Sequence, residues 1–138
     1  DGLLLRRQPY RLPKAGATAG DLAMLPEVHG LGAADWLYID TETTGLSGGS
    51  GTIAFLIGIA VVTDHRLELT QFLLTGFSGE PALLSGLAQC LSPGDRLVSY
   101  NGKSYDLPLL ITRFRMQAMA QPFGGLPHLD LLHPVRRL

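Results

Sequence analysis

The pattern of hydrophobic and polar positions in the middle of the chain predicts three consecutive strands. Residues 36–40 (WLYID) and 52–63 (TIAFLIGIAVVT) are continuous apolar runs of strand length, as expected for strands that are covered on both faces. Residues 67–75 (LELTQFLLT) alternate roughly between apolar and polar side chains, which is typical of a half-covered strand. Because short turns join the three segments, we expect an antiparallel meander.

Beyond residue 77 the spacing of apolar residues changes to that of helices. Residues 78–92 (SGEPALLSGLAQCLS) and 105–120 (YDLPLLITRFRMQAMA) each predict a helix. Short strands are expected within 95–100 (DRLVSY) and 127–133 (PHLDLLH). This order predicts an α/β fold with a mixed five-stranded sheet, in which parallel crossovers follow the meander and helices flank the sheet.

Residues 1–35 lack such a period. They are rich in Pro and Gly, and we expect an extended N-terminal arm with one short helix near residues 21–25. Residues 36–138 are then expected to form one domain. The chain begins with Asp1 and ends soon after Pro134, a residue typical of the first turn of a helix. We therefore expect the domain to be incomplete at its C-terminus.

Composition narrows the functional classes. A formal net charge of −1 excludes a grip on nucleic acid that depends on overall positive charge, but it leaves room for a metal or a small basic patch. Cys90 is the only cysteine, which excludes an intrachain disulfide and a zinc site built from cysteines. The longest apolar run, 53–62, is too short to span a bilayer, so we expect a cytoplasmic protein.

Asp40 and Glu42 come at the end of the first apolar run. Residues two apart in a strand project to the same face, so these carboxylates are expected side by side at a strand end, where open α/β sheets place their sites. Their repulsion favours a shared proton or cation, and ligands that offer only oxygen suit Mg²⁺ or Mn²⁺. The alternative is a solvated turn in which Asp40 is a cap and Glu42 is exposed.

Asp106 is the candidate third acid. It follows the strand expected within 95–100 and an Asn-Gly turn, and it lies in the first turn of the second helix, where the helix dipole is positive. Two strand ends at one edge of the sheet would bring Asp106 close to Asp40 and Glu42. The alternatives are a hairpin turn at Asn-Gly and a plain N-cap role for the aspartate.

Asp130 is a fourth acid, within the apolar segment 127–133. Its neighbours His128 and His133 suggest a metal cluster, but imidazoles at that spacing do not share one face of a strand. We therefore expect Asp130 to support the site from behind the metal ligands, and the two histidines to lie in loops.

Two segments, YIDTETTGLSGGSGTIAFLIGIA (38–60) and SYNGKSYDLPLL (99–110), resemble the first two motifs of the DEDD 3′–5′ exonucleases, the DnaQ-like group with a ribonuclease-H-like fold. The final HLDLLHPVRRL is similar to YprB-type ribonuclease-H-like domains. The resemblance covers residues 36–138. It implies hydrolysis of phosphodiester bonds at single-stranded DNA or RNA ends, with two Mg²⁺ or Mn²⁺ ions.

On matching positions, the resemblance implies that Asp40 bridges both ions, Glu42 binds one of them and Asp106 supports the other. These three acids are accordingly the expected catalytic residues and metal ligands. The residues implied in substrate binding follow the two motifs: Thr43, Thr44, Gly45, Leu46, Asn101, Lys103 and Tyr105. Hydroxyl and backbone groups of 43–45 would meet the terminal nucleotide, and Lys103 would lie near a phosphate.

The last motif of that family, a Tyr or His followed by Asp on a final helix, has no counterpart in these 138 residues. It supplies the general base and a further metal ligand, so we expect these residues alone to cleave weakly or not at all. Two other functions stay open: an inactive nucleic-acid-binding or scaffold module on the same fold, and a small-molecule enzyme such as a nucleotide phosphohydrolase. Nothing in the sequence distinguishes DNA from RNA.

Overall fold

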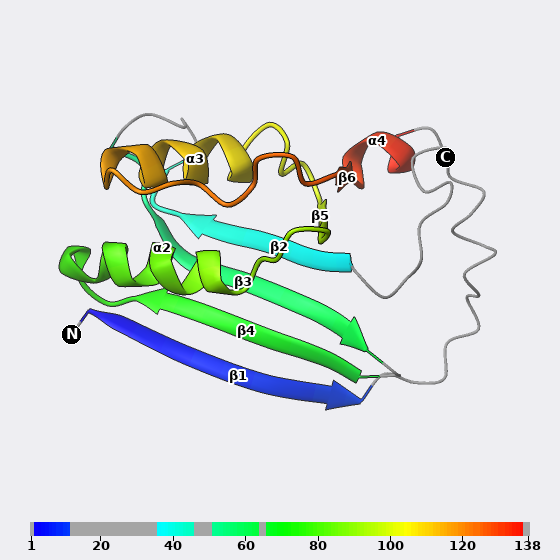
Figure 1. Ribbon diagram of the computed structural model, residues 1–138, viewed down its shortest axis with the longest axis horizontal. Coiled ribbons are helices and arrows are strands. Elements are labelled where there is room, and N and C mark those ends of the chain that lie inside the picture. Colours follow the sequence, from blue (N-terminus) through cyan, green and yellow to red (C-terminus); the bar gives the residue numbers. More distant parts are fainter. Residues whose placement is uncertain (1, 12–35, 46–50, 64–65, 137–138) are drawn as a thin grey trace.

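The computed structural model describes residues 2–11, 36–45, 51–63 and 66–136, which form a mixed sheet with helices packed on it (Figure 1). The strands are β1 (Leu3–Arg11), β2 (Trp36–Thr43), β3 (Ala54–Thr63), β4 (Arg66–Leu74), β5 (Arg96–Ser99) and β6 (His128–Asp130). The helical elements are η3 (Phe77–Gly79), α2 (Glu80–Gln89), α3 (Asp106–Met116) and α4 (Leu132–Val135). None of these helices is long and apolar enough to cross a bilayer.

The sheet has the strand order β1-β4-β3-β2-β5-β6. Strands β2, β3 and β4 pair antiparallel in sequence order, whereas β5 pairs parallel with β2 and β6 pairs parallel with β5. Helix α2 lies in the connection from β4 to β5, and α3 in the connection from β5 to β6. The predicted α/β fold, a meander followed by helical crossovers, is confirmed.

Strand β1 is the main difference from the expected five-stranded sheet. Residues 3–11, expected as part of an irregular arm, pair antiparallel with the whole of β4. Strand β1 is the edge of the sheet, and its Arg6, Arg7 and Pro9 are residues that edge strands tolerate and that otherwise indicate a loop. Residues 12–35, including the helix expected near 21–25, lie outside the described residues.

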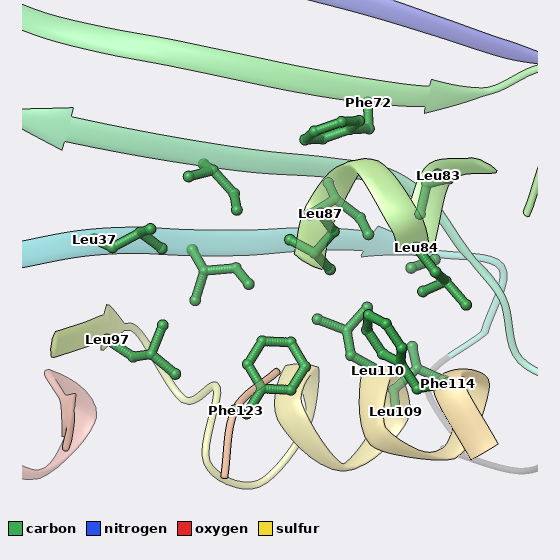
Figure 2. Packing of buried hydrophobic residues seen from close by; sticks show 14 residues of the cluster. Leu37, Phe72, Leu83, Leu84, Leu87, Leu97, Leu109, Leu110, Phe114 and Phe123 are labelled. Carbon is green, nitrogen blue, oxygen red and sulfur yellow. The ribbon is translucent and has the colours of Figure 1, made fainter. Parts of the chain in front are cut away.

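The main hydrophobic core lies between one face of the sheet and helices α2 and α3. Figure 2 shows leucines of α2 next to Phe72 of β4, leucines of α3 next to Phe114, and Leu37 of β2 near Leu97, all within one cluster. Phe114 of α3 and Phe123 pack edge to face, with ring centroids 6.0 Å apart. The buried residues of this core are Leu37, Ile39, Ala54, Ile57, Ile59, Phe72, Leu83, Leu84, Leu87, Leu97, Leu109, Leu110, Phe114 and Phe123.

The opposite face of the sheet is less covered. It carries a small cluster of Trp36, Val98 and Leu129, but the β3 residues that point to this face, such as Leu56 and Ala60, are only half-buried. The apolar run of β3 had indicated a strand covered on both faces. Within the described residues, α2 and α3 both pack on the other face, so β3 is fully covered on one side only.

A buried ion pair joins the two core helices. Glu80, at the start of α2, accepts hydrogen bonds from Arg113 Nε at 2.5 Å and Nη2 at 2.6 Å, both on α3. Gln117 Nε2 donates to the same carboxylate at 2.6 Å. Burial alone would raise the pKa of Glu80, but these hydrogen bonds and the charge of Arg113 hold it below its usual value. The pair therefore fixes how α3 sits against α2.

We expect Glu80→Ala to lower the free energy of unfolding by about 3–5 kcal/mol, because it leaves the guanidinium of Arg113 buried without this carboxylate. Urea denaturation of the purified chain measures the loss. Glu68→Ala, at an exposed position on β4, is the matched control and should change the same quantity by no more than about 0.5 kcal/mol. Equal effects of the two substitutions would contradict a stabilising role for the pair.

Candidate active site

The candidate site lies where β2 extends beyond its neighbour β5. The two strands pair only over Trp36–Tyr38, and β5 ends at Ser99 while β2 continues to Thr43. Along residues 39–43, β2 therefore has β3 on one side and, in the described part of the chain, no strand on the other. The loop from β5 into α3, residues 100–105, follows directly from the end of β5.

The acids reach this end of β2 from different elements. Asp40 and Glu42 lie two apart on β2, so both project to the face opposite the helices, and both are exposed. Thr41, between them, projects to the helical face, where its hydroxyl donates a 2.5 Å hydrogen bond to Asp106 Oδ1. Asp106 is the first residue of α3 and is buried. This bond links the strand that carries two acids to the helix that carries the third.

A cleft of about 480 Å³ runs beside these residues and contains all three acids. Its lining is mixed, with hydroxyl groups next to the carboxylates and apolar side chains from α3. The lining residues are Asp40, Thr41, Glu42, Thr43, Gly45, Thr52, Ser104, Tyr105, Asp106, Pro108, Leu109 and Thr112. The structure thus brings the two sequence motifs together at a single hollow.

The carboxyl group of Asp40 has a raised pKa. Partial burial raises the pKa of its carboxyl group, and the charges of Asp106 and Glu42 raise it further. A carboxylate that is destabilised by neighbouring carboxylates is one that a cation would stabilise, and the all-oxygen donor set suits Mg²⁺ or Mn²⁺. Among the described residues, however, no three His, Cys, Asp or Glu side chains form a group compact enough to hold a metal ion. The three acids share a cleft without forming a ready-made ligand set.

Asp130, at the end of β6, holds the loop that leads into α3. Its Oδ1 accepts hydrogen bonds from the backbone N–H groups of Asn101 at 2.6 Å and Leu132 at 3.0 Å, and its Oδ2 accepts one from Lys103 at 3.0 Å. Burial alone would raise the pKa of Asp130, but these N–H groups outweigh it and keep the pKa below its usual value. The loop conformation therefore depends on the ionised form of the Asp130 carboxylate.

A second anchor for the loop comes from Ser99. Its hydroxyl accepts a 3.1 Å hydrogen bond from the Gly102 N–H and lies 2.7 Å from His128 Nε2. A Cβ atom at Gly102 would lie only 2.3 Å from Ser99 Oγ, so this position requires glycine. Asn101 has a φ of 65°, in the left-handed region that asparagine tolerates better than most residues. The loop is held in a tight conformation next to the acids.

A sequence profile described as the RNase_H superfamily matches residues 37–138, which include every element from β2 to α4. The chain belongs to the RNase_H superfamily. It is also 43% identical over 107 residues to "Uncharacterized protein YprB" of Bacillus subtilis (strain 168). That alignment covers 73% of this chain and 24% of the relative, so the chain spans about a quarter of the relative's length.

The RNase_H superfamily fold is of the nuclease type, and its nucleases generally use divalent metal ions, which suits a cleft rich in carboxylates. Of the residues expected to bind substrate, Thr43, Gly45 and Tyr105 line the cleft. The Thr44 hydroxyl instead accepts a hydrogen bond from the Ile53 N–H, which closes the ends of the loop between β2 and β3. Leu46 lies outside the described residues.

Asn101 and Lys103 belong to the anchored loop and do not line the cleft. The Lys103 side chain is exposed. Both histidines were expected to lie in loops, and this was wrong: His128 begins β6 and His133 lies in the short helix α4. His128 faces Ser99 because β6 pairs with β5 in register, a partnership that local sequence does not reveal.

Two residues of the site were missed from sequence. Thr41 carries the link to Asp106, and the alternation of β2 did contain a signal for it, since a residue between two outward acids must face the helices. Ser99 supports Gly102, and its signal is weaker, because a serine at the end of a strand has no distinguishing pattern.

Replacing Asp130 tests whether the loop depends on its charge. We expect Asp130→Asn to lower the free energy of unfolding at pH 7 by about 1–3 kcal/mol. The amide has one acceptor oxygen where the carboxylate has two, so at least one of the three backbone N–H groups loses its acceptor and the others lose a charged one. In the folded wild type the pKa of Asp130 is lowered. Its stabilisation is therefore complete above the ordinary value near 3.9 and is lost as the pH falls through the folded-state pKa.

Urea denaturation between pH 7 and pH 3 measures this difference between wild type and variant. The gap should be constant down to about pH 4 and should narrow below it. Asp95→Asn is the matched control, because Asp95 accepts one backbone hydrogen bond, from Ser92, in a turn outside the cleft. A larger loss in the control than in Asp130→Asn would contradict the anchoring role.

Proposed function

We propose that the chain is the metal-binding part of a 3′–5′ exonuclease that hydrolyses phosphodiester bonds at single-stranded nucleic-acid ends. The observation that carries the proposal is the shared cleft of Asp40, Glu42 and Asp106 at the end of β2, in a chain of the RNase_H superfamily. The elevated pKa of Asp40 supports the proposal. Carboxylates that repel one another destabilise the fold, and such clusters are typical of functional sites.

Asp40, Glu42 and Asp106 would together hold two Mg²⁺ or Mn²⁺ ions. The chemistry that such ions would supply, when bound, is positive charge beside the phosphoryl oxygens and a more acidic water as nucleophile. Asp40 must lose its proton to act as a metal ligand. Because its pKa is raised, protons compete with the metal at higher pH than they would at an ordinary aspartate. Thr41 keeps Asp106 Oδ1 in place through their hydrogen bond.

The remaining cleft residues would bind the substrate. Thr43 and Gly45 offer hydroxyl and backbone groups at the end of β2, where a terminal nucleotide would lie. The Tyr105 side chain is 56% exposed and lines the cleft, so a base can stack on it. Lys103 lies on the same loop with an exposed side chain, and its ammonium group would meet a phosphate of the bound strand. Cytoplasmic location is part of this proposal.

Metal binding can be tested without any assay of activity. We expect Asp40→Asn to raise the thermal midpoint of the metal-free chain near pH 7, because ionised Asp40 repels its neighbours and its folded-state pKa is raised. That destabilisation disappears as the pH falls through the raised pKa. The gain should be small, a few tenths of a kcal/mol to about 1 kcal/mol, since the site is exposed to solvent.

Mg²⁺ or Mn²⁺ should then stabilise the wild type by roughly 1–3 kcal/mol at ten- to a hundredfold excess over Kd, and Asp40→Asn should abolish the effect. Thermal denaturation with and without metal measures both results. Glu68→Gln, an exposed acid on β4 outside the cleft, should behave as the wild type. Absence of any metal-dependent shift in the wild type would favour the alternative of an inactive nucleic-acid-binding or scaffold module.

Hydrolysis is tested on a 5′-labelled single-stranded oligonucleotide, as DNA and as RNA, with protein in excess because weak cleavage is expected. Shortening from the 3′ end should require Mg²⁺ or Mn²⁺ and should fall by on the order of 100-fold or more in Asp40→Asn but not in Glu68→Gln. Release of phosphate from mononucleotides without shortening of the oligonucleotide would identify a nucleotide phosphohydrolase instead.

A further inference from the structure

Two large aromatic side chains remain in solvent beside the acids. Tyr100 is 58% exposed and Tyr105 is 56% exposed, and both belong to the loop that joins β5 to α3. Tyrosines have a large apolar surface whose burial is favourable, so two exposed rings on one short loop indicate a surface that a ligand covers. Lys103, between them in the sequence, is also exposed and positively charged.

Tyr100 and Tyr105 line different hollows. Tyr105 belongs to the cleft described above, whereas Tyr100 borders a second hollow of about 450 Å³ on the less covered face of the sheet. Asp40 and Glu42 line both hollows. The two hollows therefore meet at the acid pair, with one exposed tyrosine on each side of it.

The backbone around Tyr100 is fixed although its ring is exposed. The residue before it, Ser99, accepts a 2.8 Å hydrogen bond at its carbonyl from the Leu131 N–H. The residue after it, Asn101, donates its N–H to Asp130 at 2.6 Å. A ring on so firmly held a backbone loses little conformational freedom when a flat partner stacks on it.

We propose that Tyr100 is a second stacking residue, which holds a base of a single-stranded nucleic acid on the far side of Asp40 and Glu42 from Tyr105. The substrate class is then an oligonucleotide of at least two nucleotides, because a mononucleotide has a single base and the two rings border different hollows. This rests on the proposed function, since the strand passes over the same acids. Stacking tolerates any base, so the site reads a single strand without sequence preference.

Binding tests this proposal directly. Fluorescence anisotropy measures the affinity of the chain for 5′-labelled oligothymidylates of two, four and eight nucleotides, with phosphorothioate linkages that resist cleavage, and competition with thymidine monophosphate gives the mononucleotide affinity. We expect Tyr100→Ala to weaken the oligonucleotides by roughly 5- to 100-fold and the mononucleotide by less than about twofold. Tyr100→Phe, which keeps the ring, should stay within about twofold of the wild type.

The control is Tyr10→Ala, because Tyr10 is an exposed tyrosine on β1 that borders neither hollow. It should leave every affinity unchanged. Thermal denaturation of Tyr100→Ala shows whether the variant is folded, which we expect from the exposure of the side chain. Equal losses for mononucleotide and oligonucleotides, no loss for either, or no binding of oligonucleotides by the wild type would each overturn the proposal. No loss would point to a protein segment as the occupant of the second hollow.

Failure of the proposed function gives a different result. If the wild type binds the phosphorothioate oligonucleotides in the Tyr100-dependent manner but never shortens unmodified oligonucleotides with Mg²⁺ or Mn²⁺, the exonuclease proposal fails and the stacking role stands. If it shortens them equally well in wild type and Tyr100→Ala at concentrations of oligonucleotide below KM, the exonuclease proposal stands and the stacking role fails.

Discussion

The hydrogen bonds from three backbone N–H groups to the carboxylate of Asp130 are the interaction on which the site depends. Two of them, from Asn101 and Lys103, tie the loop after β5 to the end of β6, and the third comes from Leu132 at the start of α4. This loop carries Tyr100, Lys103, Tyr105 and the entry to α3. A buried carboxylate is costly unless it is fully hydrogen-bonded, so the loop and the charge stabilise each other. They also compensate for the left-handed backbone at Asn101.

Sheet topology provides the space that this loop occupies. Because β5 pairs with only the first three residues of β2, the second half of β2 meets side chains from the loop and α3 on that side in place of a strand. In this space the Thr41 hydroxyl donates its hydrogen bond to Asp106, while Asp40 and Glu42 face the other side of the sheet. A longer β5 would pair with residues 39–43 and would leave less room for the cleft.

The sequence allowed most of this arrangement to be predicted, for identifiable reasons. The long apolar runs of β2 and β3 and the leucine spacing of α2 are strong signals, and the two-residue period placed Asp40 and Glu42 side by side. Strand β1 was not predicted, because an edge strand that contains Arg6, Arg7 and Pro9 has the composition of a loop. The contact of His128 with Ser99 was not predicted, because the register of parallel strands is set by tertiary packing.

The acids of the site have different surroundings, and those of Asp40 favour a nearby cation. Asp106 accepts a hydrogen bond from Thr41 and lies at the positive end of α3, and Asp130 is satisfied by backbone donors. Asp40 instead has its pKa raised by partial burial and by the charges of Asp106 and Glu42, so its surroundings disfavour its negative charge. A divalent ion bound beside Asp40 would oppose the repulsion from Asp106 and Glu42, because its positive charge favours the ionised form of the carboxyl group. Metal binding and protonation would therefore compete at Asp40.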